Sequence, residues 1–312
     1  MNLYRTMRVV LSLTVIVVLL PWSFSFAQTN SCKEGDTNHD GRVTLTDFET
    51  WRRVFRGGVT PSMTPTPPTN QSPSGEAMPV GNLPQFRQIY TEDFTVDAPL
   101  GSFPQAKYSS KFTYYPDGTA DTAGGAGKPS MYYTTKVASV TGGVLKLHLH
   151  QENGTNLVSA LVPTASGQLY GKYTIRYRVA NHEQGIGFKQ EWVLWPQSDL
   201  FPQDGALNIE TEFGSTITGK VIYPQAPSSS LRYDVHQTGT SVNAWHTASI
   251  EWTPGKAEFT IDGVSKGVST ANVPNQPLVW IIQTASCAAS CPQPGANADV
   301  EIDWLTIYAY QP

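Results

Sequence analysis

The chain has 312 residues, a formal net charge of −4 and only 15% charged residues. Its 26 glycines, 23 prolines, 14 tyrosines and 8 tryptophans are typical of a turn-rich β protein and argue against a helical bundle. The sequence contains no basic stripe, so nucleic acid is not expected as a partner.

Residues 1–27 have the layout of a secretory signal peptide. Arg5 and Arg8 precede the apolar run 9–20, and Ser25-Phe26-Ala27 provides a small-x-small cleavage site. The run of 12 residues is short for a membrane span, although an uncleaved anchor stays open as an alternative. We therefore expect a secreted, extracellular protein with no membrane attachment after cleavage. Retention at the cell surface remains an alternative.

Residues 28–57 carry oxygen-bearing side chains at the spacing of a calcium loop. Gly41 stands where such a loop turns sharply, and an amphipathic helical pattern follows it. The expected Ca²⁺ ligands are Asp36, Asn38, Asp40, Thr44, Asp47 and the carbonyl of Arg42.

This segment resembles one calcium-binding segment of a dockerin, the module that docks secreted glycan-degrading enzymes onto cohesin partners. Dockerins carry two such segments, whereas this sequence shows one, so a cohesin-like partner is expected only as an alternative. Residues 58–83 are rich in proline, threonine and serine and are expected to form an extended, semi-stiff linker.

Residues 84–312 are a succession of short strand patterns separated by Gly, Pro, Asn and Asp turns. Alternating segments include 144–150, 173–179, 247–252, 257–263 and 300–308, and no stretch has a convincing helical period. The fold class predicted here is all-β, a two-sheet sandwich of the jelly-roll type.

The three cysteines leave alternatives open. Cys287 and Cys291 enclose three residues, and an oxidising export compartment would permit a disulfide between them. A metal site is the other option. Cys32 is left over, either free or paired with another chain.

The segment Asp204–Gly214 places polar residues on one strand face. Asn208, Glu210 and Glu212 alternate with apolar Leu207 and Ile209. Carboxylates two residues apart on a strand are separated by about 6.5–7 Å at the backbone. Such a pair can divide the acid and base roles in cleaving a sugar–sugar bond, and the alternative is a solvated surface strand.

Eight motifs in order resemble glycoside hydrolase family 16, the group of laminarinases, lichenases and agarases, over residues 86–310. The resemblance implies a concanavalin-like jelly roll, an open glycan cleft on its concave sheet and retaining hydrolysis of β-linked glucans or galactans. It also implies a second, structural Ca²⁺ in the sandwich, for which no ligands can be assigned. The motifs begin at Tyr90-Thr-Glu-Asp-Phe, Gly143-Val-Leu-Lys-Leu, Tyr170-Gly-Lys-Tyr, Trp192-Val-Leu-Trp-Pro, Asp204-Gly-Ala-Leu-Asn, Trp245-His-Thr, Phe259-Thr-Ile-Asp-Gly and Ile302-Asp-Trp-Leu.

The catalytic strand departs from the family pattern Glu-x-Asp-x-Glu, in which the first Glu is the nucleophile. One register puts Ala206 at the nucleophile and Asn208 at the Asp position, and its acid/base position falls on Glu210 without a bulge or on Thr211 with one. The other register puts Asn208, Glu210 and Glu212 at the three positions. Both registers lose the nucleophile, so the expected catalytic residues are Glu210 and Glu212 as a pair, with Asn208 beside them.

Three functions are consistent with the sequence. The favoured one is a secreted, endo-acting β-glycan hydrolase with a degenerate catalytic motif. The second is an inactive module that binds polysaccharide in the same cleft, and the third is a structural or cell-surface module. The expected substrate-binding residues are Trp192, Trp195, Trp280 and Gln283.

Overall fold

The computed structural model describes residues 72–123, 125–224 and 230–312. The chain divides between residues 66 and 67, and the described residues belong to the C-terminal unit. The predicted signal peptide, the calcium segment, Cys32 and the linker up to residue 71 lie outside the described residues and stay predictions. No helix among the described residues is both long and apolar enough to cross a membrane.

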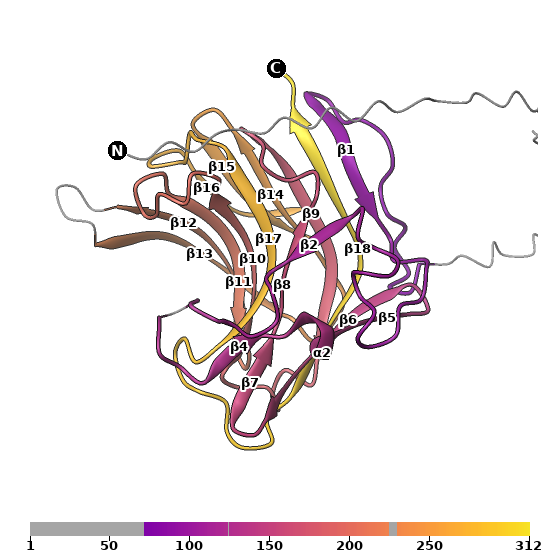
Figure 1. Cartoon of the computed structure of the whole chain (residues 1–312). Helices are drawn as coiled ribbons and strands as arrows, with labels where there is room; N and C mark the ends of the chain where they lie inside the picture. The colour runs from indigo at the N-terminus through magenta and orange to yellow at the C-terminus, as the bar shows by residue number, and fades with distance from the viewer. Residues whose placement is uncertain (1–71, 124, 225–229) are drawn as a thin grey trace, which may run out of the picture. The chain divides into compact units, whose positions relative to one another are not determined.

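The described residues form two β-sheets (Figure 1). The back sheet has the order β16 (Val264–Ser269), β15 (Lys256–Ile261), β14 (His246–Thr253), β9 (Gly171–Ala180), β18 (Ala298–Tyr310), β6 (Val144–Glu152), β7 (Thr155–Val158), β4 (Ser130–Tyr132) and β3 (Thr119–Ala120). Strand β1 (Phe86–Glu92) also pairs with β18, and β5 (Ala138–Thr141) with β6.

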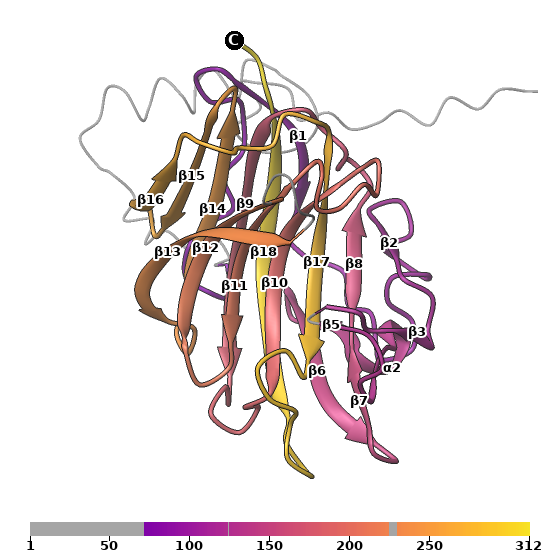
Figure 2. The ribbon, with the colours of Figure 1, turned by 90° about the vertical axis from the view of Figure 1, so that its left-hand side faces the viewer.

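The front sheet has seven strands, which Figure 2 shows side by side. Every pairing within it is antiparallel. Its order is β13 (Leu231–Ser241), β12 (Thr216–Pro224), β11 (Ala206–Glu212), β10 (Phe188–Pro196), β17 (Leu278–Ser286), β8 (Ala160–Pro163) and β2 (Phe112–Tyr114). The one helix of the described residues is the short α2 (Thr134–Val137).

This architecture confirms the predicted all-β, two-sheet fold of jelly-roll type. The strand patterns expected from alternation correspond to β6, β9, β14, β15 and β18. In β6, for example, Leu145, Leu147 and Leu149 are fully buried. The intervening Lys146 and His148 both pair with Asp299 of β18, at 3.1 and 2.7 Å. A period of two therefore separates the core face of this strand from its solvated face.

The hydrophobic core lies between the two sheets, where aromatic rings of one sheet meet those of the other. The Trp192 ring on β10 meets Tyr177 of β9 edge-on at 5.0 Å, and Trp280 on β17 meets Tyr173 of β9 at 5.5 Å. Edge-to-face pairs of this kind add about 0.5–1.5 kcal/mol beyond the burial of their apolar area. The other face of the front sheet, turned away from this core, is therefore free to carry a site.

Candidate functional site

A cavity of 640 Å³ lies on the face of the front sheet that is turned away from the back sheet. Side chains of β10, β11, β12, β13 and β17 line it, so it extends across the strands. We call it the cleft. Its aromatic lining consists of Tyr115, Tyr132, Trp195, Phe201 and Tyr233.

Strands β10 and β11 bring charged side chains together on the floor of the cleft. Their antiparallel register runs without a shift, pairing Lys189 with Glu212 and Glu191 with Glu210. Because residues two apart share a face, Asn208, Glu210 and Glu212 all line the cleft, as do Lys189 and Glu191. The predicted common face of Asn208, Glu210 and Glu212 is therefore present in the structure.

Glu210 is a buried carboxylate with partners on both oxygens. Asn208 Nδ2 donates a hydrogen bond of 2.6 Å to its Oε2. The ammonium group of Lys220, on β12, forms an ion pair with its Oε1. Lys189 Nζ lies 3.7 Å from Oε2. These cations and the amide stabilise a negative charge on Glu210.

Lys189 is a buried cation, only 7% exposed, that three carboxylates share. It forms an ion pair with Glu191 and lies 3.6 Å from Glu212 Oε1, in addition to its contact with Glu210. Burial alone would lower the pKa of the Lys189 ammonium, but the surrounding carboxylates outweigh burial and raise it. Glu191 also accepts a 3.1 Å hydrogen bond from Gln283 Nε2 of β17. Burial raises the pKa of Glu191.

Glu212 is the most accessible of the three carboxylates, with 32% of its side chain exposed against 10% for Glu191 and Glu210. Burial raises its pKa, and the negative charge of Glu210 raises it further, while Lys189 opposes both effects. The floor of the cleft thus holds an ion-paired carboxylate, Glu210, next to Glu212, a carboxyl group whose pKa is raised above its ordinary value. Such a difference between neighbouring carboxyls is how acid and base roles are divided in hydrolytic sites.

Comparison with known proteins identifies the family of this domain. The sequence model of the family described as Glycosyl hydrolases family 16 matches residues 126–306, more than half of the chain. The chain belongs to glycosyl hydrolase family 16. No curated protein matches it.

Solved structures show the same fold. The laminarinase from Rhodothermus marinus superposes with a TM-score of 0.56 at 18% identity, covering 74% of this chain and 100% of that one. The Bacillus licheniformis β-glucanase gives 0.55 at 14%, covering 71% and 98%. LamAcat from Zobellia galactanivorans gives 0.56 at 16%, covering 71% and 97%. At these identities the likeness concerns the fold of the family 16 domain.

The family 16 catalytic motif falls on β11, whose regular pairing with β10 shows no bulge of the kind that would bring Thr211 to the acid/base position. Both bulge-free registers stay open: the nucleophile, Asp and acid/base positions fall on Ala206, Asn208 and Glu210, or on Asn208, Glu210 and Glu212. Ala206 is fully buried, and its methyl side chain cannot act as a nucleophile. Glu212 lies outside the family pattern in the first register and stands at the acid/base position in the second.

Two of the four expected substrate-binding residues line the cleft and two do not. Trp195 and Gln283 line it. The expectation for Trp192 and Trp280 is wrong, because each is 1% exposed and belongs to the core between the sheets. The reason is the period of two: Trp192 lies three residues from Trp195, and Trp280 three residues from Gln283, so each pair is divided between opposite faces.

Sequence reasoning missed Lys189, Glu191 and Lys220. The signal was present on β10, where Lys189, Glu191 and Trp195 occupy alternate positions of one face. Recognising it required knowing that β10 and β12 both lie beside β11, which follows from the sheet order and not from the local pattern.

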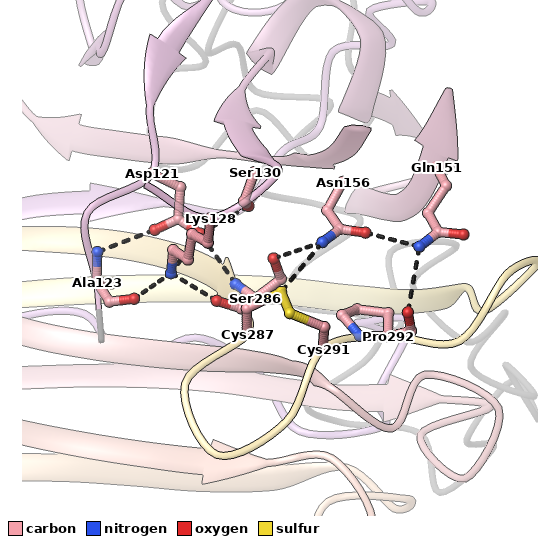
Figure 3. Close-up of a disulfide and its surroundings, with 10 residues drawn as sticks. All are labelled: Asp121, Ala123, Lys128, Ser130, Gln151, Asn156, Ser286, Cys287, Cys291 and Pro292. Atoms are coloured by element: carbon pink, nitrogen blue, oxygen red, sulfur yellow. Dashed lines mark hydrogen bonds and ion pairs between the residues drawn. A yellow bond between two sulfur atoms is a disulfide. The ribbon is translucent and has the colours of Figure 1, made fainter. Parts of the chain in front are cut away.

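A disulfide borders the cleft beyond the end of β17 (Figure 3). Cys287 and Cys291 are bonded, which decides between the two alternatives that the sequence left open. Ala288 and Ala289, inside this small loop, line the cleft. Among the described residues, no group of three or more His, Cys, Asp and Glu side chains is arranged to hold a metal.

A buried ion pair joins a second loop to the same end of β17. Lys128 Nζ lies 3.0 Å from Asp121 Oδ2 and donates a 2.5 Å hydrogen bond to the carbonyl of Ser286. Asp121 in turn accepts a 3.0 Å bond from the Ser286 N–H. Thr122 and Ala123, next to Asp121, line the cleft, so this ion pair and the disulfide together fix one wall of the cleft.

Proposed function

We propose that this family 16 domain binds a β-linked glucan or galactan across the front sheet and hydrolyses internal glycosidic bonds with Glu210 and Glu212. The observation that carries the proposal is the pair of unlike carboxyl groups on the cleft floor. Both have an oxygen within 3.7 Å of the Lys189 amine, so one cation contacts both carboxyl groups. The neighbours described as laminarinase and β-glucanase support β-glucans as the substrate class.

The two carboxyl groups fit the two roles of a retaining mechanism. Glu210, held as an anion, attacks the anomeric carbon and forms a glycosyl ester while the bond to the leaving oxygen breaks. Glu212, whose raised pKa favours the protonated form, gives its proton to that oxygen. The resulting Glu212 carboxylate then takes a proton from water as the water displaces Glu210 from the sugar. Asn208 orients Glu210 through its hydrogen bond.

Binding without hydrolysis is the second candidate. Neither register has a carboxylate at the nucleophile position, because Ala206 or Asn208 stands there. The ion pairs of Glu210 with two lysines also weaken this carboxylate as a nucleophile, because they stabilise its charge. The cleft, its aromatic lining and Gln283 would still bind a glycan. In this case the protein migrates more slowly in a gel that contains the polysaccharide, but it releases no reducing sugar.

The test is reducing-sugar release from laminarin, lichenan and agarose by the wild type and by Glu210→Gln and Glu212→Gln. We expect each variant to lower kcat by about 10²–10⁴-fold, the range that a positioned acid or base contributes. Glu258→Gln, on β15 of the back sheet, is the matched control and should leave kcat unchanged. An active wild type with both cleft variants equally active would refute the catalytic pair. An inactive wild type that binds the glycan would establish the second candidate.

We also propose that residues 1–27 direct export and that residues 36–47 bind Ca²⁺. These proposals rest on the charge and hydropathy of the N-terminal segment and on the spacing of oxygen ligands between Asp36 and Asp47. Polysaccharide is then the expected partner outside the cell. A cohesin-like partner would need a second calcium segment of the dockerin kind.

A further inference from the structure

Among the described residues of the cleft floor, only Lys189 has its amine within 4 Å of three carboxylates. Those carboxylates come from two strands, Glu191 from β10 and Glu210 and Glu212 from β11. The remaining charged neighbours are Lys220 of β12, which pairs with Glu210, and Asp121 of the loop after β3, which adds negative potential at Glu191. The β17 neighbour, Gln283, is uncharged.

The balance of charge on this floor depends on Lys189. With it, two ammonium groups face three carboxylates, and each carboxylate has at least one cation within 4 Å. Without it, Lys220 alone remains, and it contacts only Glu210 among the three. Like charges at such distances disfavour ionisation, so at least one of the carboxyls would then hold a proton or turn away from the others.

We propose that Lys189 is a positioning residue, which fixes the spacing and the charge states of Glu210 and Glu212 without itself contacting the reacting atoms. This inference deepens the proposed function and rests on it for the catalytic consequence. The lysine and its closest partner Glu191 lie on β10, outside the catalytic motif on β11, so the family pattern alone does not assign them a role. Their position follows from the register between the two strands.

The expected effect on the pH profile has a definite sign. A cation favours the ionised form of a carboxyl, and an opposite charge at 4–6 Å typically lowers a carboxyl pKa by about 1–3 units. Replacing Lys189 with methionine removes that effect from Glu212, the proposed acid. The alkaline limb of the kcat/KM profile should therefore move to higher pH, by about one unit, and kcat should fall at least about tenfold because the spacing of the two carboxyl groups is no longer fixed.

The experiment compares Lys189→Met, Lys189→Arg and Lys256→Met in the full chain. Lys189→Arg keeps the charge and should restore most of the wild-type pH profile. Lys256→Met removes a lysine that pairs with Glu258 on the back sheet and should leave the profile unchanged. A Lys189→Met enzyme that folds and keeps both the wild-type profile and the wild-type kcat would overturn the proposal.

A second measurement separates this proposal from the proposed function. The carboxyl carbon of Glu212 is titrated by NMR in ¹³C-labelled protein, with its signal assigned from the Glu212→Gln variant. A higher midpoint in Lys189→Met supports the electrostatic role even if no glycan is hydrolysed, and an unchanged midpoint overturns it. Should Lys189→Met fail to fold, Lys189→Met combined with Glu191→Gln removes one charge of each sign. Its Glu212 midpoint is compared with that of Glu191→Gln alone, and an equal midpoint overturns the proposal.

Discussion

At the scale of single residues, the chemistry of this cleft depends on how unlike its carboxyl groups are. Glu210 has a partner on each oxygen, whereas Glu212 is partly exposed and burial raises its pKa. Two glutamates of the same strand face thus differ because β10 and β12 offer them different neighbours. The sequence predicted which side chains share the face, since alternation alone determines that, but their partners come from other strands.

The acid role of Glu212 predicts the alkaline limb of the pH profile. A general acid must be protonated, so kcat/KM should fall as the pH rises through the pKa of Glu212. Because that pKa is raised, the limb should lie at higher pH than an exposed glutamate would give. The measurement is the profile of wild type and Glu212→Gln on an aryl glycoside whose leaving group needs no proton. The variant should keep activity on this substrate and lose the alkaline limb, and a limb that persists would assign the acid role elsewhere.

At the scale of elements, strand β10 serves the core with one face and the cleft with the other. Trp192 packs against Tyr177 of the back sheet, while Trp195 lines the cleft, stacks on Phe201 at 4.3 Å and donates a 2.8 Å hydrogen bond to Asp199. The sandwich and its strands β6, β9, β14, β15 and β18 could be predicted from the sequence, because alternating apolar residues bounded by turn residues are typical of strands with one buried face. The prediction for Trp192 is wrong because residue type alone does not show whether a tryptophan ring packs in the core or faces a sugar.

The two tryptophans of β10 should therefore separate stability from binding. Trp192→Ala should lower the free energy of unfolding by about 3–5 kcal/mol, as large-to-small changes of buried aromatic residues do. Trp195→Ala should lower the free energy of unfolding much less. It should also reduce the retardation of the protein in affinity gels that contain the glycan. Denaturant unfolding and gel mobility of both variants provide the measurements. Equal losses of stability, with unchanged retardation for Trp195→Ala, would contradict this division of the two faces.

At the scale of the whole molecule, the chain joins a family 16 domain to an N-terminal stretch of different composition. The sequence predicts calcium binding there, because five oxygen-bearing side chains recur at the spacing of a calcium loop. The domain itself could be predicted from eight motifs in order. The arrangement of the lysines Lys189 and Lys220 around Glu210 could not, since it requires three strands to be placed side by side.

Calcium binding should be measurable on the full chain by titration calorimetry. We expect one site in residues 36–47 that Asp36→Ala combined with Asp40→Ala abolishes, because two of its charged ligands are removed. Asp262→Ala, in the turn after β15, is a control that should leave binding intact. Calcium uptake by the double variant equal to that of the wild type would place the ion elsewhere.

The width of the front sheet has a consequence for the length of substrate. Its seven strands leave six intervals of about 4.8 Å each, so the sheet is about 29 Å across. The cleft follows this direction, with Tyr233 on the edge strand β13 and Tyr115 just beyond β2 at the opposite edge. A disaccharide would cover only a fraction of that distance and leave one or both outer rings untouched. Turnover should therefore climb with the degree of polymerisation and level off once a chain reaches from one tyrosine to the other.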